Sequence, residues 1–246
     1  MFLSRPPRDS ITETDLIFSG GGHDRPLSVR RSAQAKRMRL AVDPRDGAVR
    51  LTLPRRAALK PALLWVENQR AWIEQVLSRL PVTEPLGPGT EIPFEGAPML
   101  VDWQPGGSRT ARREGDRLIV GGPEEMVGAR VLRWLRAEAT RILDAETRAV
   151  AARAGVTVGR VRIGDPRTRW GSCSAGGDIA YSWRLILMPP AVREATVVHE
   201  VAHRLHMHHG PEFHAEVERL LGRAPKAERA WLKAHGAAVH RLGQAG

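Results

Sequence analysis

The sequence contains one cysteine, Cys173, one tyrosine and no long apolar run. A single cysteine cannot form an internal disulfide, so packing or a bound metal must stabilise the fold, as suits a reducing compartment. The first ten residues, MFLSRPPRDS, lack the apolar core of a signal peptide. Nowhere do about eighteen apolar residues follow one another, as a membrane span would need. We therefore expect a soluble cytoplasmic protein with no membrane partner.

Acidic residues are in deficit. The chain has 27 Asp and Glu against 38 Lys and Arg, which gives a formal net charge of +11 at pH 7. Such a balance favours polyanionic partners, either nucleic acid or nucleotide phosphates. However, the arginines are spread along the chain, without a basic arm that interleaves aromatics and without zinc-finger spacing. That distribution is more typical of solvated, ion-paired helix faces, so a polyanion is a partner suggested by charge alone.

The 246 residues, 42% of them hydrophobic, suffice for one large domain or two modest ones. Residues 37–53 alternate apolar and polar side chains around a turn at 43–47, which predicts a β-hairpin. Residues 56–80 have helical spacing, and short β segments follow between 91 and 120. The sequence thus predicts a β-rich N-terminal region with one helix, spanning residues 1–122.

A second region is predicted for residues 123–246. Pro123 opens a long helix with no breaker before Gly155. A strand follows at 156–163, then two strands joined by a turn at 174–178; Pro189-Pro190 ends the second of them, and a helix starts at once after it. We find no internal repeat and no low-complexity tract. The order of elements predicts an α+β fold.

Histidine is concentrated in this second region, with six of the nine histidines between positions 199 and 214. His199, Glu200 and His203 form H-E-x-x-H. On a helix, two imidazoles four residues apart lie on one face and can bind the same metal ion. Glu200 projects to the side, where it can accept a proton from a water on that metal. Two helical histidines can also simply cap or hydrogen-bond, but the surrounding histidines favour a catalytic zinc, which needs three protein ligands and an open position.

A third ligand must come from beyond this helix. In a continuous helix, His209 would lie about 9 Å further along and about 240° around the axis, out of reach of the ion. Gly210 can end the helix in a left-handed conformation, and Pro211 can open a new one, which allows His209 to fold back. We therefore favour His209. The alternatives are two other histidines and two downstream carboxylates, His206, His214, Glu216 and Glu218.

Three stretches give the chain a more specific likeness: RWGSCS at 169–174, WRLILMPP at 183–190 leading into the VVHEVAH helix, and HHGPEF at 208–213. Together they resemble the YgjP-like metallopeptidases, minimal zincins related to the WLM and SprT-like proteins. The resemblance implies a zincin-like domain, with a small mixed sheet and an active-site helix. It also implies that three histidines bind zinc and one glutamate is catalytic, namely His199, His203, His209 and Glu200.

The chain departs from the usual pattern of that family at three positions. The family usually has asparagine at His208, serine at Gly210 and asparagine at Ser182. The first two positions bear on the turn that carries His209, and the third bears on the strand beside the cleft.

These features lead us to expect a zinc metallopeptidase that acts on peptides or proteins. Tyr181, Arg184 and His206 are candidates for binding substrate or the oxyanion. By analogy with zincins, residues 178–187 would form a sheet edge to which an extended peptide can pair. Two alternatives remain: a metal-dependent phosphoanhydride hydrolase that acts on nucleotides, and a basic nucleic-acid-associated module with a structural zinc.

Four residues near the motif have ordinary interpretations. We expect Trp170 and Trp183 to belong to the core, and Gly171 to let the backbone approach the site. Cys173 is better explained as a small buried side chain than as a regulatory thiolate, because no basic helix terminus lies beside it in the sequence.

Overall fold

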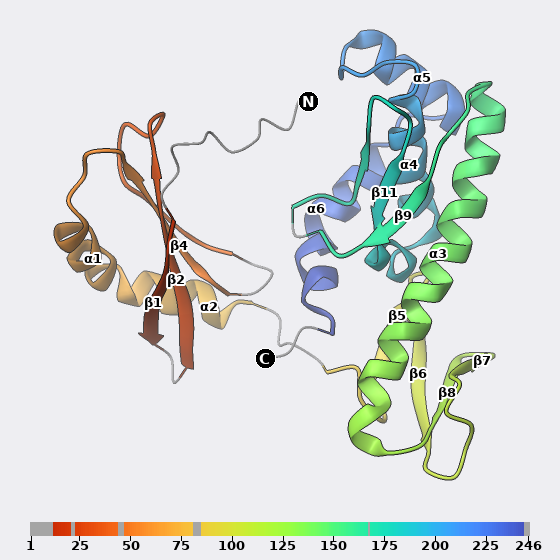
Figure 1. Ribbon diagram of the computed structural model, residues 1–246, viewed down its shortest axis with the longest axis horizontal. Coiled ribbons are helices and arrows are strands. Elements are labelled where there is room, and N and C mark those ends of the chain that lie inside the picture. Colours follow the sequence, from red (N-terminus) through yellow and green to blue (C-terminus); the bar gives the residue numbers. More distant parts are fainter. Residues whose placement is uncertain (1–11, 21–22, 44–46, 81–84, 167, 244–246) are drawn as a thin grey trace. The chain divides into compact units, whose positions relative to one another are not determined.

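The computed structural model describes residues 12–20, 23–43, 47–80, 85–166 and 168–243. These residues form eleven strands and six α-helices, with two short 3-10 segments, so the protein has the predicted α+β fold. The chain divides into two compact units, Phe2–Val82 and Thr83–Gly246 (Figure 1). None of the helices within the described ranges is both long and apolar enough to cross a membrane.

The first unit is a four-stranded sheet with two helices. Its elements are β1 (Thr12–Gly20), β2 (His23–Ser32), β3 (Arg39–Val42), β4 (Val49–Pro54), α1 (Leu59–Asn68) and α2 (Arg70–Ser78). The sheet order is β1-β2-β4-β3, in which β2 and β4 are parallel and the other neighbours are antiparallel.

The hairpin predicted over 37–53 is confirmed as β3 and β4, and its residues 44–46 lie outside the described part of the chain. Alternation in β4 buries Val49, Leu51 and Leu53 completely, in one core with residues of both helices. The single helix predicted over 56–80 is instead two helices, which meet at Gln69.

The second unit contains two further sheets and four helices. Its strands are β5 (Glu91–Phe94), β6 (Ala97–Gln104), β7 (Arg112–Glu114), β8 (Arg117–Gly121), β9 (Val161–Gly164), β10 (Gly171–Cys173) and β11 (Ile179–Ser182). Its helices are α3 (Val127–Ala154), α4 (Pro190–Ala202), α5 (Pro211–Leu221) and α6 (Lys226–Arg241). The sheet orders are β5-β6-β8-β7 and β10-β11-β9.

The 28-residue helix α3 connects these two sheets and runs past both of them (Figure 1). Buried side chains recur every four residues along it, at Val131, Leu135, Ala139 and Leu143. It ends at Gly155, whose φ of 67° is left-handed. The long helix predicted between Pro123 and Gly155 is thereby confirmed, although it begins at Val127, after a 3-10 segment at Glu124–Met126.

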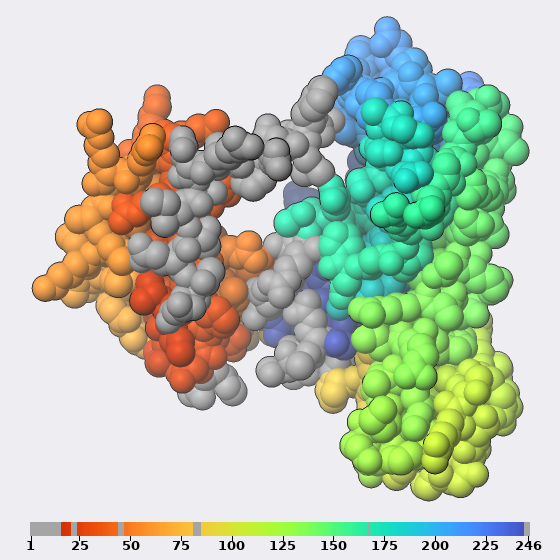
Figure 2. All heavy atoms as spheres, in the orientation of Figure 1, coloured from red at the N-terminus to blue at the C-terminus, as the bar shows by residue number. Residues whose placement is uncertain are grey.

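The sheet β5–β8 belongs with the second unit, so the observed division lies earlier in the chain than the boundary after residue 122 that the sequence suggests. Leu118 and Val120 of β8 share one core with Val131 and Leu135 of α3. In Figure 2 the yellow-green atoms of this sheet lie directly against the green atoms of α3. The apolar side chains of β8 pack against α3, but nothing in the local sequence pattern indicates which element they will contact. The boundary suggested by the sequence, after residue 122, is misplaced for this reason.

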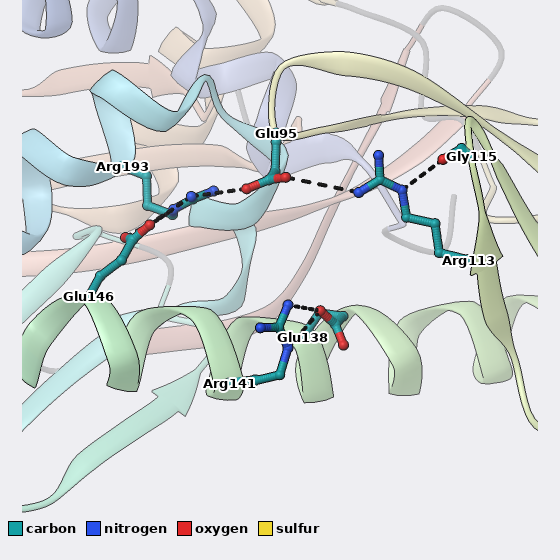
Figure 3. A network of polar contacts seen from close by, with 7 residues as sticks. All are labelled: Glu95, Arg113, Gly115, Glu138, Arg141, Glu146 and Arg193. Carbon is teal, nitrogen blue, oxygen red and sulfur yellow. Dashed lines mark hydrogen bonds and ion pairs between the residues drawn. The ribbon is translucent and has the colours of Figure 1, made fainter.

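Polar contacts also tie this sheet to the helix that carries the histidines. The nearly buried guanidinium of Arg193, on α4, donates to both carboxylate oxygens of Glu146 on α3, with Nε at 2.9 and 3.0 Å. The same guanidinium donates to Glu95, between β5 and β6, at 3.0 Å (Figure 3). The backbone N–H of Glu95 donates to the carbonyl of Ile186 at 2.7 Å. The start of α4 is thus held by both α3 and the β5–β6 turn.

The strand expected at 178–187 is shorter than predicted and is not an edge. It ends at Ser182, whose hydroxyl accepts a hydrogen bond from the backbone N–H of Arg184, and residues 183–187 form a buried 3-10 turn. β11 is the central strand, antiparallel to β10 and parallel to β9. The edge strand that packs against α4 is β10.

Candidate metal centre

The histidines lie where α4 ends and the chain turns towards α5. His199 occupies the last turn of α4, and His203 is the capping residue just after it. The backbone N–H groups of Arg204 and Leu205 bond to the carbonyls of Val201 and Ala202, which makes a tight turn. α5 then begins with Pro211 at its first position, as predicted.

The prediction of a left-handed Gly210 is wrong. Its φ of −79° and ψ of −178° are extended, and it caps the N-terminus of α5 instead of ending α4. The reversal occurs directly after His203, several residues earlier than expected, so no left-handed residue is needed at 210.

The three favoured ligands converge. The candidate ligand atoms of His199, His203 and His209 all lie within 4.8 Å of one another. The Nε2 atoms of His199 and His209 are 3.0 Å apart. The Nδ1 atom of His203 lies 3.1 Å from the carbonyl oxygen of His206, and a proton donated there leaves Nε2 of His203 for a metal.

This donor set fits a divalent metal ion such as zinc. Two nitrogens bound to one tetrahedral zinc at about 2.0–2.1 Å lie roughly 3.3 Å from each other, close to the 3.0 Å between the Nε2 atoms of His199 and His209. Three imidazoles provide the number of protein ligands that a catalytic zinc site uses, which leaves one position open.

Phe213 forms the floor under the three imidazoles. Its side chain is fully buried in α5, and its ring centroid lies 4.9, 4.6 and 4.7 Å from those of His199, His203 and His209. The sequence gives no sign of this role, because an apolar residue at the start of a helix is ordinary core.

The surroundings keep the imidazoles neutral. Burial, and then the proximity of His203 and His209, lower the pKa of His199 to about 3. Burial also lowers the pKa of His203 and of His209. Neutral imidazole has the free lone pair that binds a metal, so the site is in its ligating form at pH 7.

Glu200 is buried beside this cluster, with an exposed fraction of 6%. Burial raises the pKa of its carboxyl group to about 8, and the charge of Arg169 opposes that rise. Gly171 of β10 lies against it: a Cβ at position 171 would come within 2.6 Å of Cγ and Oε1 of Glu200. Only glycine leaves room for this carboxylate, which supports the expectation that Gly171 allows a close backbone approach.

A cavity of about 340 Å³ opens beside His199 and Glu200. It is lined by residues of α4, α5, α6 and the start of β10: Arg169, Trp170, Gly171, Ala195, Thr196, His199, Glu200, Val217, Pro225, Glu228, Arg229 and Leu232. The contribution of α6 is not foreseen from the sequence, because its residues lie more than twenty positions beyond the motif.

Two of the three candidate substrate-binding side chains need correction. Tyr181 is fully buried on β11, and its hydroxyl is 3.2 Å from Oγ1 of Thr147. Arg184 is almost fully buried, forms an ion pair with Asp165 and lies over the ring of Trp183. Both side chains are committed to the interior, so we assign them to the fold and not to substrate binding.

The remaining candidates take other positions. His206 contributes its backbone carbonyl to His203, and its partly exposed side chain is outside the cluster of ligand atoms. Among the rival ligands, His214 stacks edge-on against Phe213, Glu216 pairs with Arg219, and Glu218 is exposed. In the structure, His209 therefore lies beside the two histidines of the motif, and none of the four rival ligands does.

The ordinary interpretations of the neighbouring residues need two refinements, because Trp170 and Cys173, both expected from the sequence to be buried, are only partly buried. Trp183 is core, as expected, whereas Trp170 is only partly buried, stacks on His240 at 4.1 Å and lines the cavity. Burial raises the pKa of the Cys173 thiol, the opposite of what a reactive thiolate requires.

Comparison with known proteins gives one finding. The family model of the YgjP-like metallopeptidase domain matches residues 36–235, a range that contains all three histidines and Glu200. No curated protein and no solved structure matches the chain.

Proposed function

Because the chain belongs to the YgjP-like metallopeptidase family, we propose that it is a zinc-dependent peptidase whose general base is Glu200. The observation that carries the proposal is the convergence of three neutral imidazoles beside one buried carboxyl group. The family and the donor set together support zinc as the metal.

The residues of the site divide the work of peptide hydrolysis. When bound, zinc supplies Lewis-acid chemistry, because it polarises the scissile carbonyl and makes water more acidic. Glu200 accepts a proton from the attacking water and delivers it to the departing amine. Burial raises the pKa of Glu200 to about 8, and the positive charge of a bound zinc ion would lower it, so that the ionised carboxylate can accept the proton and return it at pH 7.

The edge strand β10 offers a place for the peptide backbone. It is the outer strand of its sheet, packs against α4 and carries Gly171 next to Glu200. An extended peptide added to this edge would run past the catalytic carboxylate. This replaces the strand at 178–187 as the expected docking edge.

Metal analysis and activity on one pair of variants test the proposal. We expect one zinc per chain and hydrolysis of unfolded casein that a chelator abolishes. Glu200→Gln should bind zinc normally but lose about 100-fold or more in kcat/KM. Glu218→Gln, which removes an exposed carboxylate from α5, is the matched control and should retain full activity.

Three results would contradict the proposal. A protein with no stoichiometric transition metal would rule out the metal centre. Full activity of Glu200→Gln would rule out the base. Release of phosphate or pyrophosphate from nucleotides without any cleavage of casein would replace the peptidase with a phosphoanhydride hydrolase.

A further inference from the structure

Two exposed arginines line the cavity and have no side-chain partner among the described residues. Arg169, just before β10, and Arg229, on α6, both line the cavity that contains His199 and Glu200. Within the described ranges, neither forms an ion pair or a side-chain hydrogen bond. Other arginines nearby are committed: Arg219 pairs with Glu216, and Arg223 pairs with Glu228.

The charges of these two arginines reach the reacting groups. Burial is the main cause of the raised pKa of Glu200 and of the lowered pKa of His199. The charge of Arg169 opposes the first shift, and the charge of Arg229 adds to the second after those of the other two histidines of the cluster. Since both arginines line the same cavity as His199 and Glu200, their positive charge lies at the cavity beside the metal centre and not on a remote surface.

The rest of the cavity is largely apolar. Trp170, Val217 and Leu232 contribute to its wall, together with Ala195 and Pro225. The one other carboxylate in the lining, Glu228, has Oε1 held by Arg223 at 2.7 Å, which offsets its repulsion of an anion. The cavity thus combines an apolar surface with two cations that are unpaired within the described part of the chain.

We propose that this cavity binds the C-terminal residue of a peptide: its apolar side chain enters the cavity and its terminal carboxylate binds Arg169 and Arg229. In a peptide, an apolar side chain and a negative charge occur on the same residue only at the C-terminus. The guanidinium fork matches a carboxylate in two parallel hydrogen bonds. This inference rests on the proposed peptidase function and narrows its substrate.

The reaction that follows is removal of one residue from the C-terminus. The oxygen of water bonds to the last peptide carbonyl carbon, the C–N bond breaks, and the amine leaves with the proton that Glu200 returns. The products are a shortened peptide and a free apolar amino acid.

Binding tests the inference without turnover. The protein is Glu200→Gln loaded with zinc, and the probes are two peptides ending in leucine that differ only in a free carboxylate or a C-terminal amide. We expect calorimetry to show about tenfold tighter binding of the free acid, since hydrogen bonds between charged groups are the stronger ones. In the same background, the added double change Arg169→Gln and Arg229→Gln should reduce the ratio of the two affinities to about one.

Arg133→Gln is the matched control, because Arg133 is an exposed arginine of α3 outside the cavity lining. It removes the same charge and should leave the preference for the free acid intact. Equal affinity for acid and amide, or a preference that survives the double change, would overturn the inference. So would a nucleoside triphosphate that displaces the free acid and binds more tightly, since the arginines would then serve a phosphate.

Turnover separates this inference from the proposed function. If wild-type enzyme releases leucine from the free acid and the double variant loses this activity mainly through a raised KM, both are supported. If the binding preference holds but no peptide is ever cleaved, the peptidase proposal fails and the carboxylate subsite stands.

Discussion

At the scale of the residue, Phe213 and Gly171 shape the centre without carrying a reactive group. Phe213 gives the three imidazoles a common apolar floor, and Gly171 leaves the space that the Glu200 side chain fills. Such residues restrict the rotamers of the reacting groups. This restriction increases the affinity of a metal site and orients a catalytic base towards its substrate.

Phe213→Ala should weaken both the fold and the metal site. Truncating a fully buried phenylalanine costs about 3–5 kcal/mol of unfolding free energy, and loss of the floor should lower zinc affinity about tenfold or more. Urea unfolding and competition with a chelator measure the two effects. Phe213→Leu keeps most of the volume and should cost less than about 1.5 kcal/mol. Unchanged zinc affinity in Phe213→Ala would show that the imidazoles hold their places without it.

Gly171→Ala should separate catalysis from metal binding. The added Cβ would displace the Glu200 carboxylate, so we expect kcat to fall about tenfold or more while the zinc content stays at one per chain. Gly176→Ala is the control, because its Cβ meets only the Ser174 hydroxyl, at 3.9 Å. Equal activity of Gly171→Ala and wild type would mean that Glu200 can move without loss.

The reacting residues could be predicted from the sequence because helix periodicity fixes their relation. His199 and His203 must share a face at a spacing of four, and Glu200 must project beside them. The roles of Arg169 and Arg229 could not be predicted, since they depend on packing between segments sixty positions apart in the chain. Tyr181 and Arg184 failed as substrate candidates for the same reason: whether a side chain of the strand β11, or of the 3-10 turn after it, is buried depends on which other elements pack against it.

At the scale of the element, the position of α4 depends on its anchored first turn. Arg193 binds Glu146 and Glu95 there, whereas the neighbouring pair of Arg141 and Glu138 lies on the exposed face of α3 (Figure 3). Arg193 connects three elements that are distant in sequence, whereas Arg141 pairs only with a residue of its own helix.

Arg193→Met should therefore cost far more stability than Arg141→Met. Removing the nearly buried cation leaves Glu146 without this partner and Glu95 with only Arg113, at 4.0 Å, and should cost about 3 kcal/mol, while the exposed i,i+3 pair contributes about 0.5 kcal/mol or less. Urea unfolding of both variants at low and moderate salt measures the difference. Similar losses for the two would mean that the anchor is no stronger than a surface pair.

Helix α3 and the end of β11 show what local pattern can and cannot predict. Twenty-eight residues without a breaker, followed by Gly155, leave little alternative to a helix. Residues 178–187 keep β-like composition throughout, yet the hydroxyl of Ser182 binds the N–H of Arg184 and turns the chain. A single side-chain cap of this kind outweighs strand propensity, and propensity alone does not reveal it.

At the scale of the whole molecule, the chain has two separate hydrophobic cores. One lies among β1–β4, α1 and α2, and the other extends from Leu86 through α3 to α6. The family model spans residues 36–235 and so includes most of both.

A fragment of residues 83–246 should fold alone and bind one zinc, while a fragment of 123–246 should not. The shorter fragment lacks β5–β8, which leaves Val131 and Leu135 of α3 without the side chains that cover them. Thermal unfolding followed by circular dichroism, together with zinc content, compares the two. Cooperative unfolding of the 123–246 fragment would restore the boundary that the sequence suggests.

His209 lies on the connection between α4 and α5, whereas His199 and His203 lie in the last turn of α4 and at its C-cap. Removal of the metal by a chelator should therefore increase the mobility of this connection, while the two ligands on α4 stay in place. Affinity for the ion would then depend on how readily that segment orders, so stiffening residues 204–210 offers a route to tighter metal retention that touches no ligand.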